Sequence, residues 1–256
     1  MTLLRREWTA AFFALLLSAC VTVDEDGKSP AQPSDKQAAV YAQLAERYMV
    51  ENRLDIALRE AETALSLDSR NAYANDVMAR IQVRLRNNDK AETHYRRAVS
   101  ADPSSGIIRN NYGTFLCEQG RVADAVDEFL VAAKNPLYAR PDIAYSNAAV
   151  CLMKKPDPMK AAIHFKAALE KNPRMPLPLY YMAQISFESG QPLAARGFMS
   201  RYLEIAKDSP GVLLLAVRIE RALGAKDAMA SYSVRLRGKY PDSPEARQLR
   251  QLLGQK

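Results

Sequence analysis

Small apolar residues recur along the chain from residue 38 at a nearly fixed interval. The recurring positions are Ala57, Ala91, Ala125, Ala161, Ala195 and Met229, which are spaced by 34, 34, 36, 34 and 34 residues. Each of these anchors is followed, four and seven residues later, by two more packing positions, among them Ala61 and Ala64, Phe129 and Ala132, and Phe165 and Ala168. Steps of four and seven residues lie on one face of an α-helix. The pattern therefore predicts one amphipathic helix in each repeat.

Proline, glycine and asparagine mark the ends of the predicted helices. Prolines fall eleven or twelve residues after four of the anchors, at Pro103, Pro136, Pro173 and Pro241. A proline ends one helix and suits the start of the next. Residues that tolerate the left-handed backbone conformation stand five residues before four anchors, at Asn52, Gly120, Gly190 and Gly224. Each repeat is thus predicted to be a hairpin of two helices joined by a tight turn.

The first helix of each predicted hairpin carries a large residue, an adjacent packing pair and another apolar residue, as in Tyr41, Leu44, Ala45 and Tyr48. The small member of the pair lets the second helix approach closely. A 34-residue unit with these features resembles the tetratricopeptide repeat. The resemblance is strongest in the second, third and fourth repeats. It implies an all-α fold, a right-handed α-solenoid of six helical hairpins with a C-terminal capping helix.

The repeat pattern divides the chain into segments. We expect a lipoprotein signal peptide at 1–19, a lipidated flexible tether at 20–37, repeats at 38–71, 72–105, 106–141, 142–175, 176–209 and 210–243, and a polar capping helix at 244–256. One hairpin alone cannot bury its apolar face, so stability comes from the stacking of neighbours. The two extra residues between Ala125 and Ala161 lie around 137–141, and they predict a looser joint between the third and fourth repeats.

The N-terminus has the features of a secretory signal. Arg5 and Arg6 precede an apolar stretch, residues 10–17, that is too short to span a bilayer. The stretch ends in Leu-Ser-Ala-Cys, which resembles the bacterial lipobox and implies a lipid on Cys20. The alternative is a simple cleaved signal followed by an unrelated cysteine. Inner-membrane lipoproteins commonly carry Asp where this chain has Val21, so the resemblance implies the periplasmic face of the outer membrane of a Gram-negative bacterium.

Charge and composition narrow the choice of partners. The chain is 48% hydrophobic and 25% charged, so it is expected to fold. Its formal net charge is +7, but the basic residues are scattered rather than concentrated beside stacking aromatics. This distribution indicates solvated helix faces and no nucleic-acid partner. The alternative for the basic residues is a favourable interaction with an anionic membrane surface.

With Cys20 assigned to a lipid, two cysteines remain in an oxidising compartment. Cys117 and Cys151 are 34 residues apart, each late in the first helix of neighbouring hairpins. Successive first helices stack side by side, so a disulfide across the third and fourth repeats is predicted if the α-carbons lie within about 7 Å. The alternative is two buried free thiols.

The chain shows no arrangement expected of an enzyme. His94 and His164 occupy equivalent places two repeats apart, where they do not converge. We find no metal-ligand cluster, phosphate-binding glycine loop or nucleophile motif. The sequence therefore predicts no catalytic residue, no metal, no cofactor and no small-molecule substrate. A periplasmic hydrolase is the third hypothesis, and it would need a catalytic cluster that these residues do not form.

The first helices are expected to line the concave face, which is the default binding surface of such a stack. The candidate partner-binding residues are Met49, Tyr73, Arg80, Val83, Asn110, Asn111, Asn147, Met153, Tyr180 and Tyr181. Asn111 and Asn147 hold the same place in consecutive repeats, where an amide can both donate to and accept from a peptide backbone. The alternative for each asparagine is a solvated surface amide.

The lipobox, the short tether, six repeats and the cysteine pair together resemble the type IV pilus biogenesis lipoproteins of the PilF/PilW pilotin family. The segments Asn110–Gly113 and Tyr145–Ala148, with Cys117, Gly120 and Cys151, carry the resemblance. It implies that the chain binds the pilus secretin as its protein partner and promotes secretin localisation and multimerisation for pilus assembly and twitching motility. The alternative is a lipoprotein scaffold for outer-membrane barrel assembly or for cell-wall enzymes.

Overall fold

The structure, a computed structural model, describes residues 33–154 and 157–254. The predicted signal peptide, the predicted lipid attachment at Cys20 and the tether up to residue 32 lie outside the described residues. The described part holds thirteen α-helices and no β-strand. The predicted all-α fold is therefore confirmed.

Twelve of the helices form six consecutive hairpins. The hairpins are α1 (Pro33–Val50) with α2 (Leu54–Leu67), α3 (Ala72–Arg84) with α4 (Asn88–Ala101), α5 (Gly106–Glu118) with α6 (Val122–Lys134), α7 (Pro141–Lys154) with α8 (Pro158–Lys171), α9 (Pro176–Glu188) with α10 (Pro192–Ile205), and α11 (Pro210–Ala222) with α12 (Lys226–Lys239). A thirteenth helix, α13 (Pro244–Leu252), ends the described chain. The first helix begins at Pro33, five residues before the predicted start of the first repeat.

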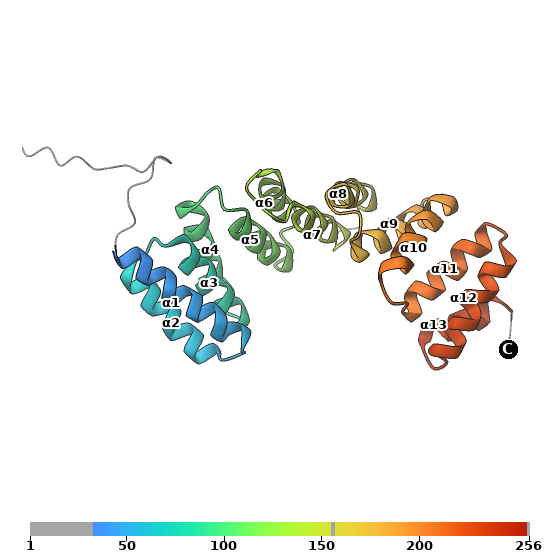
Figure 1. Cartoon of the computed structure of the whole chain (residues 1–256), viewed down its shortest axis with the longest axis horizontal. Coiled ribbons are helices and arrows are strands. Elements are labelled where there is room, and N and C mark those ends of the chain that lie inside the picture. Colours follow the sequence, from blue (N-terminus) through green and yellow to red (C-terminus); the bar gives the residue numbers. More distant parts are fainter. Residues whose placement is uncertain (1–32, 155–156, 255–256) are drawn as a thin grey trace, which may run out of the picture.

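The hairpins lie side by side in one curved row, with α1 and α2 at one end and α11 to α13 at the other (Figure 1). In the middle of the row, α6 and α8 lie on the outer side of the curve, and α5 and α7 lie on the inner side. A small rotation from each repeat to the next produces this curvature. None of the helices in the described ranges is long and apolar enough to cross a membrane.

The repeat anchors lie at the centre of the core. Ala57, Ala91, Ala125, Ala161 and Ala195 are fully buried, whereas Met229 is partly buried. Phe129 and Phe165, four residues after their anchors, are the largest fully buried side chains. Small anchors let the two helices of a hairpin approach, and the large rings fill the space toward the next hairpin.

The turns inside the hairpins adopt the left-handed conformation. Positive φ angles between 61° and 76° occur at Asn52, Arg86, Gly120, Gly190 and Gly224. The predictions for Asn52 and the three glycines are thus confirmed. Arg86 holds the equivalent place in the second hairpin, where the sequence has neither glycine nor asparagine. The packing of the hairpin therefore imposes the left-handed conformation on Arg86. This conformation costs a residue with a Cβ about 1 kcal/mol.

The prediction of a looser joint between the third and fourth hairpins is wrong. Six residues connect α6 to α7, but this longer link is packed against the body of the solenoid. The side-chain amide of Asn135 donates to the backbone carbonyl oxygen of Ser104. The Tyr138 ring packs with Ala133 and lies so close to Gly106 that a Cβ there would be 2.5 Å from it. The two extra residues therefore add packing contacts between the hairpins and do not loosen the joint.

The helix α13 covers the end of the row. Ser243 caps its first turn by accepting a hydrogen bond from the Ala246 amide. Ala246 and Leu249 are fully buried against Leu213, Val217 and Leu236 of the last hairpin. The helix thus caps the end of the row with a buried apolar face, and its other residues are mainly polar or charged.

Candidate partner-binding groove

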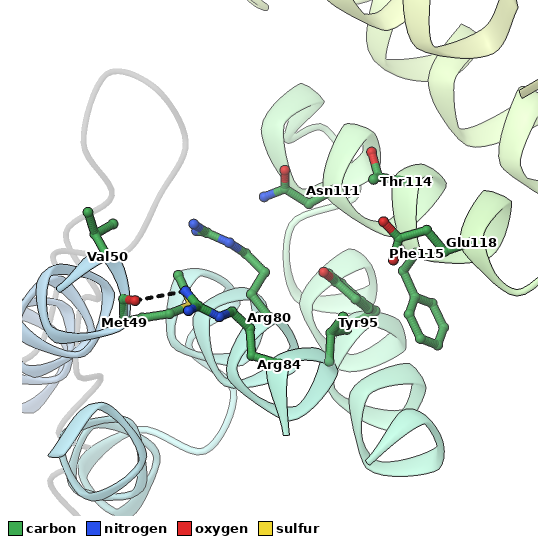
Figure 2. A pocket seen from close by; sticks show the side chains of 10 residues that line it. Met49, Val50, Arg80, Arg84, Tyr95, Asn111, Thr114, Phe115 and Glu118 are labelled. Carbon is green, nitrogen blue, oxygen red and sulfur yellow. Dashed lines mark hydrogen bonds between the residues drawn. The ribbon is translucent and has the colours of Figure 1, made fainter. Parts of the chain in front are cut away.

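Three first helices enclose an open hollow of 340 Å³, which we call the first-helix groove. It is lined by Met49 and Val50 of α1, Arg80, Val83 and Arg84 of α3, Tyr95 of α4, and Asn111, Thr114, Phe115 and Glu118 of α5. Four of the ten predicted partner-binding residues, Met49, Arg80, Val83 and Asn111, therefore meet in one place. Figure 2 shows Arg80 and Asn111 reaching into the hollow from α3 and α5, whereas the Arg84 side chain turns to Met49 of α1.

A charged network fixes Arg80 at the floor of the groove. Its guanidinium donates to Glu46 Oε1 at 2.6 Å and lies 3.6 Å from Asp76 Oδ2. Tyr73, another predicted residue, donates its hydroxyl to the other oxygen of Glu46. Burial alone would raise the pKa of Glu46, but the hydrogen bonds from Tyr73 and Arg80 outweigh it and lower that pKa. Burial, followed by the negative Glu46, raises the pKa of Tyr73 above its usual value.

Asp76 is the most deeply buried charge of this network. Only 1% of the residue is exposed, and its two carboxylate oxygens accept hydrogen bonds of 3.1 Å from the Asn111 amide. Burial raises the pKa of Asp76 to about 6, against the opposing effects of Asn111 and Arg80. The Asn111 amide group thus holds α5 to α3 as well as facing the groove.

Asp76 should make stability depend on pH in a direction opposite to that of most carboxylates. Its pKa rises from 3.8 to about 6 on folding, so the folded state retains a proton that the unfolded state releases between these values. Raising the pH from about 4 to 7 should therefore cost wild type about 2 kcal/mol relative to Asp76→Asn. Urea unfolding of both proteins from about pH 4 to 7 measures this difference. Stability curves that stay parallel across the window would contradict it.

The predicted asparagine pair continues the network toward α7. Asn147 donates its amide to Asn110 Oδ1 at 3.0 Å, so the bond joins α7 to α5. Both residues are partly exposed. The side-chain amide groups of Asn111 and Asn147 therefore bridge consecutive first helices, and both residues remain partly exposed.

The other predicted residues lie farther along the row. Met153 of α7 and Tyr181 of α9 pack at the margin of the cluster around Phe165, where the Tyr181 and Phe165 rings stack at 5.2 Å. Tyr180 meets Tyr181 edge to face and packs toward Tyr202. These three residues are half-buried and do not line the first-helix groove.

Six lining residues were missed by the sequence analysis: Val50, Arg84, Tyr95, Thr114, Phe115 and Glu118. Arg84 lies four residues after Arg80, and Glu118 lies seven residues after Asn111, so helical spacing from the predicted residues would have found both. Arg84 donates to the Met49 carbonyl oxygen at 2.9 Å and to the Asn52 side chain. Tyr95 is buried with the core aromatics, yet Figure 2 shows its side chain at the floor of the hollow.

Cys117 and Cys151 form a disulfide in the structure, with their α-carbons 5.8 Å apart. The bond links α5 to α7. Lys154 reinforces the same joint by donating to the Cys117 carbonyl oxygen at 3.1 Å. The third and fourth hairpins are thus connected covalently and by a charged hydrogen bond.

The histidines lie apart from each other and from the groove. His94 Nδ1 is 3.0 Å from the Asn75 side-chain oxygen, and His164 stacks on Tyr145. Within residues 33–154 and 157–254, no group of three or more His, Cys, Asp or Glu side chains is placed to hold a metal ion.

Comparison with known proteins identifies the family. Residues 77–142 match the tetratricopeptide repeat family. The type IV pilus assembly protein PilF of Pseudomonas aeruginosa is 26% identical over 233 residues, 91% of this chain and 92% of PilF. The solved structure of that PilF superposes with a TM-score of 0.76 at 25% identity over 86% of this chain and 99% of PilF. PilW, a widely conserved type IV pilus biogenesis factor, is 32% identical with a TM-score of 0.69, over 83% of this chain and 97% of PilW.

The chain belongs to the PilF/PilW family. The predicted resemblance to this family is confirmed, and it extends over nearly the full length of both relatives. In this PilF/PilW protein, the first-helix groove is lined by side chains of both charges and by apolar side chains from the first three hairpins.

Proposed function

We propose that the chain serves type IV pilus biogenesis as an outer-membrane-anchored pilotin. It binds the pilus secretin and promotes secretin localisation and multimerisation in the outer membrane. The observation that carries this proposal is the match along most of the chain to two pilus proteins, PilF and PilW.

The first-helix groove is the proposed secretin-binding surface. Arg80 and Arg84 of α3 and Glu118 of α5 line the groove, so it presents charges of both signs. Val50 is 73% exposed and lines the groove together with the partly exposed Val83, so these two residues provide apolar contacts. An extended or amphipathic secretin segment that carries both apolar and charged side chains fits this combination.

The proposed lipid on Cys20 supplies the membrane location. A protein held to one surface concentrates its partner there without any new contact. The groove would then hold a secretin segment near the membrane in which the ring is built. In this account the chain acts by binding alone and needs no chemistry of its own.

Substituting Cys20 by serine tests the proposed anchor. The described core lies within residues 33–154 and 157–254, so Cys20→Ser should leave the solenoid folded. The substitution should nevertheless strongly reduce the secretin rings recovered from the outer membrane. Membrane fractionation, with circular dichroism of the purified variant as the folding control, measures both effects. Normal outer-membrane rings in this variant would refute the proposed anchor.

A further inference from the structure

A second hollow, of 490 Å³, lies on the second hairpin away from the first-helix groove. We call it the basic hollow; it is lined by Ser69, Arg70, Arg96, Arg97, Ser100 and Ala101. Ser69 and Arg70 belong to the connection between α2 and α3, and the other four residues belong to the C-terminal half of α4. Half of the lining residues are arginines, and none is acidic.

Two of these arginines are not neutralised. Arg96 pairs with Glu92 at 2.6 Å, but Arg70 and Arg97 are exposed and form no ion pair with any described residue. Some other arginines are paired, as Arg109 is with Glu128 and Arg235 with Asp208. The basic hollow therefore holds two uncompensated positive charges close together.

The surroundings of Arg97 extend the positive region. A neighbouring hollow shares Ser69 and Arg97 with the first and adds Lys90 and His94, with Glu62 as its acidic group. Burial and then the positive charge of Arg97 lower the pKa of His94. Phosphate oxygens are the groups that this chemistry favours, because guanidinium groups donate to them bidentately and serine hydroxyls add further donors.

We propose that the basic hollow docks on the phosphate headgroups of an anionic phospholipid membrane. This inference rests on the proposed function, which places the lipid on Cys20. The first two hairpins are the part of the solenoid nearest to Cys20 in sequence. Docking the α4 side on the membrane leaves the groove, formed mainly by α1, α3 and α5, free to bind the secretin.

The fifth hairpin provides a matched control within the same chain. Arg174 and Arg201 hold the positions relative to Ala195 that Arg70 and Arg97 hold relative to Ala91. There, however, Arg201 donates to the Pro173 carbonyl oxygen at 3.1 Å and lies over the Phe198 ring. Glu204 also stands in the position of Ser100. The equivalent site thus has the same two arginines, but the Arg201 side chain is bound to its own hairpin and an acidic residue replaces a serine.

Vesicle sedimentation tests the proposal with a chain that begins at residue 20 and carries Cys20→Ser, which retains every described helix. This protein should bind vesicles of phosphatidylcholine with phosphatidylglycerol and not vesicles of phosphatidylcholine alone. Arg70→Gln with Arg97→Gln should weaken that binding about 25-fold, because each basic side chain at an anionic surface contributes about fivefold. Arg174→Gln with Arg201→Gln, which removes the same charge, should retain most of the binding.

Several outcomes would overturn the membrane proposal. Equal losses in the two double variants would show a general effect of net charge. Binding of inorganic phosphate without binding of anionic vesicles would assign the hollow to a free anion. If the Cys20→Ser protein with intact arginines does not bind anionic vesicles but still captures the secretin, this inference alone is refuted. Vesicle binding without secretin capture would refute the proposed function alone.

Discussion

Replacing Gly113 by valine is expected to lower the free energy of unfolding by about 3 kcal/mol. Gly113 lies in the middle of α5, where a Cβ would stand 2.9 Å from the Phe129 ring and 3.1 Å from the Ala125 carbonyl oxygen. Phe129 is fully buried and the carbonyl belongs to the backbone of α6, so neither can move away without disturbing the hairpin. Urea denaturation of the purified proteins measures the loss.

Gly197→Val is the matched control for this substitution. Gly197 is also inside a helix, α10, but a Cβ there would meet no atom within 4 Å. Its replacement should therefore change stability by less than about 0.5 kcal/mol. Equal losses at the two sites would mean that helix propensity, and not the close approach of α5 and α6, explains the result.

The second large effect is expected from removing the disulfide. Cys117→Ala with Cys151→Ala should lower the free energy of unfolding by about 3 to 4 kcal/mol, because the bond closes a loop of 34 residues in the unfolded chain. Cys151 is fully buried, so alanine avoids the cost of burying a hydroxyl group. The measurement is urea unfolding of the variant beside wild type.

Reduced wild type provides the control for the cysteine variant. It retains both sulfur atoms in the core, together with the Lys154 and Asn147 hydrogen bonds that join α5 to α7. It should lose about as much stability as the double variant, since the cross-link is absent in both. A reduced protein that unfolds at the same urea concentration as the oxidised protein would show that the disulfide contributes nothing.

The fold was predictable because a repeat imposes the same packing on equivalent residues. The anchors from Ala57 to Ala195 are all fully buried, and Gly120, Gly190 and Gly224 all have positive φ. Arg86 shows the limit of this reasoning, since it takes the same conformation without the residue type that signals it. The joint near Tyr138 shows another limit, because chain length reveals an insertion and not whether its side chains pack.

The groove was only partly predictable because its polar partners lie in different repeats. Asn111 bonds Asp76, 35 residues away, whereas Asn147 bonds Asn110 and not the equivalent Asn111. These pairings depend on how far each first helix is shifted along its neighbour. The sequence of a single chain indicates which face of a helix a residue occupies, but it does not fix how far one first helix is shifted along the next.

Affinity capture from detergent-solubilised membranes is the most direct test of the central claim that this groove binds the secretin. Wild type should capture the secretin. Val50→Asp with Glu118→Lys, two exposed positions in the groove, should reduce capture at least about tenfold. Val131→Asp with Glu170→Lys, on α6 and α8 outside the groove, should capture as much as wild type. Capture of a barrel-assembly protein or a cell-wall enzyme instead, or full secretin capture by the groove variant, would contradict the account.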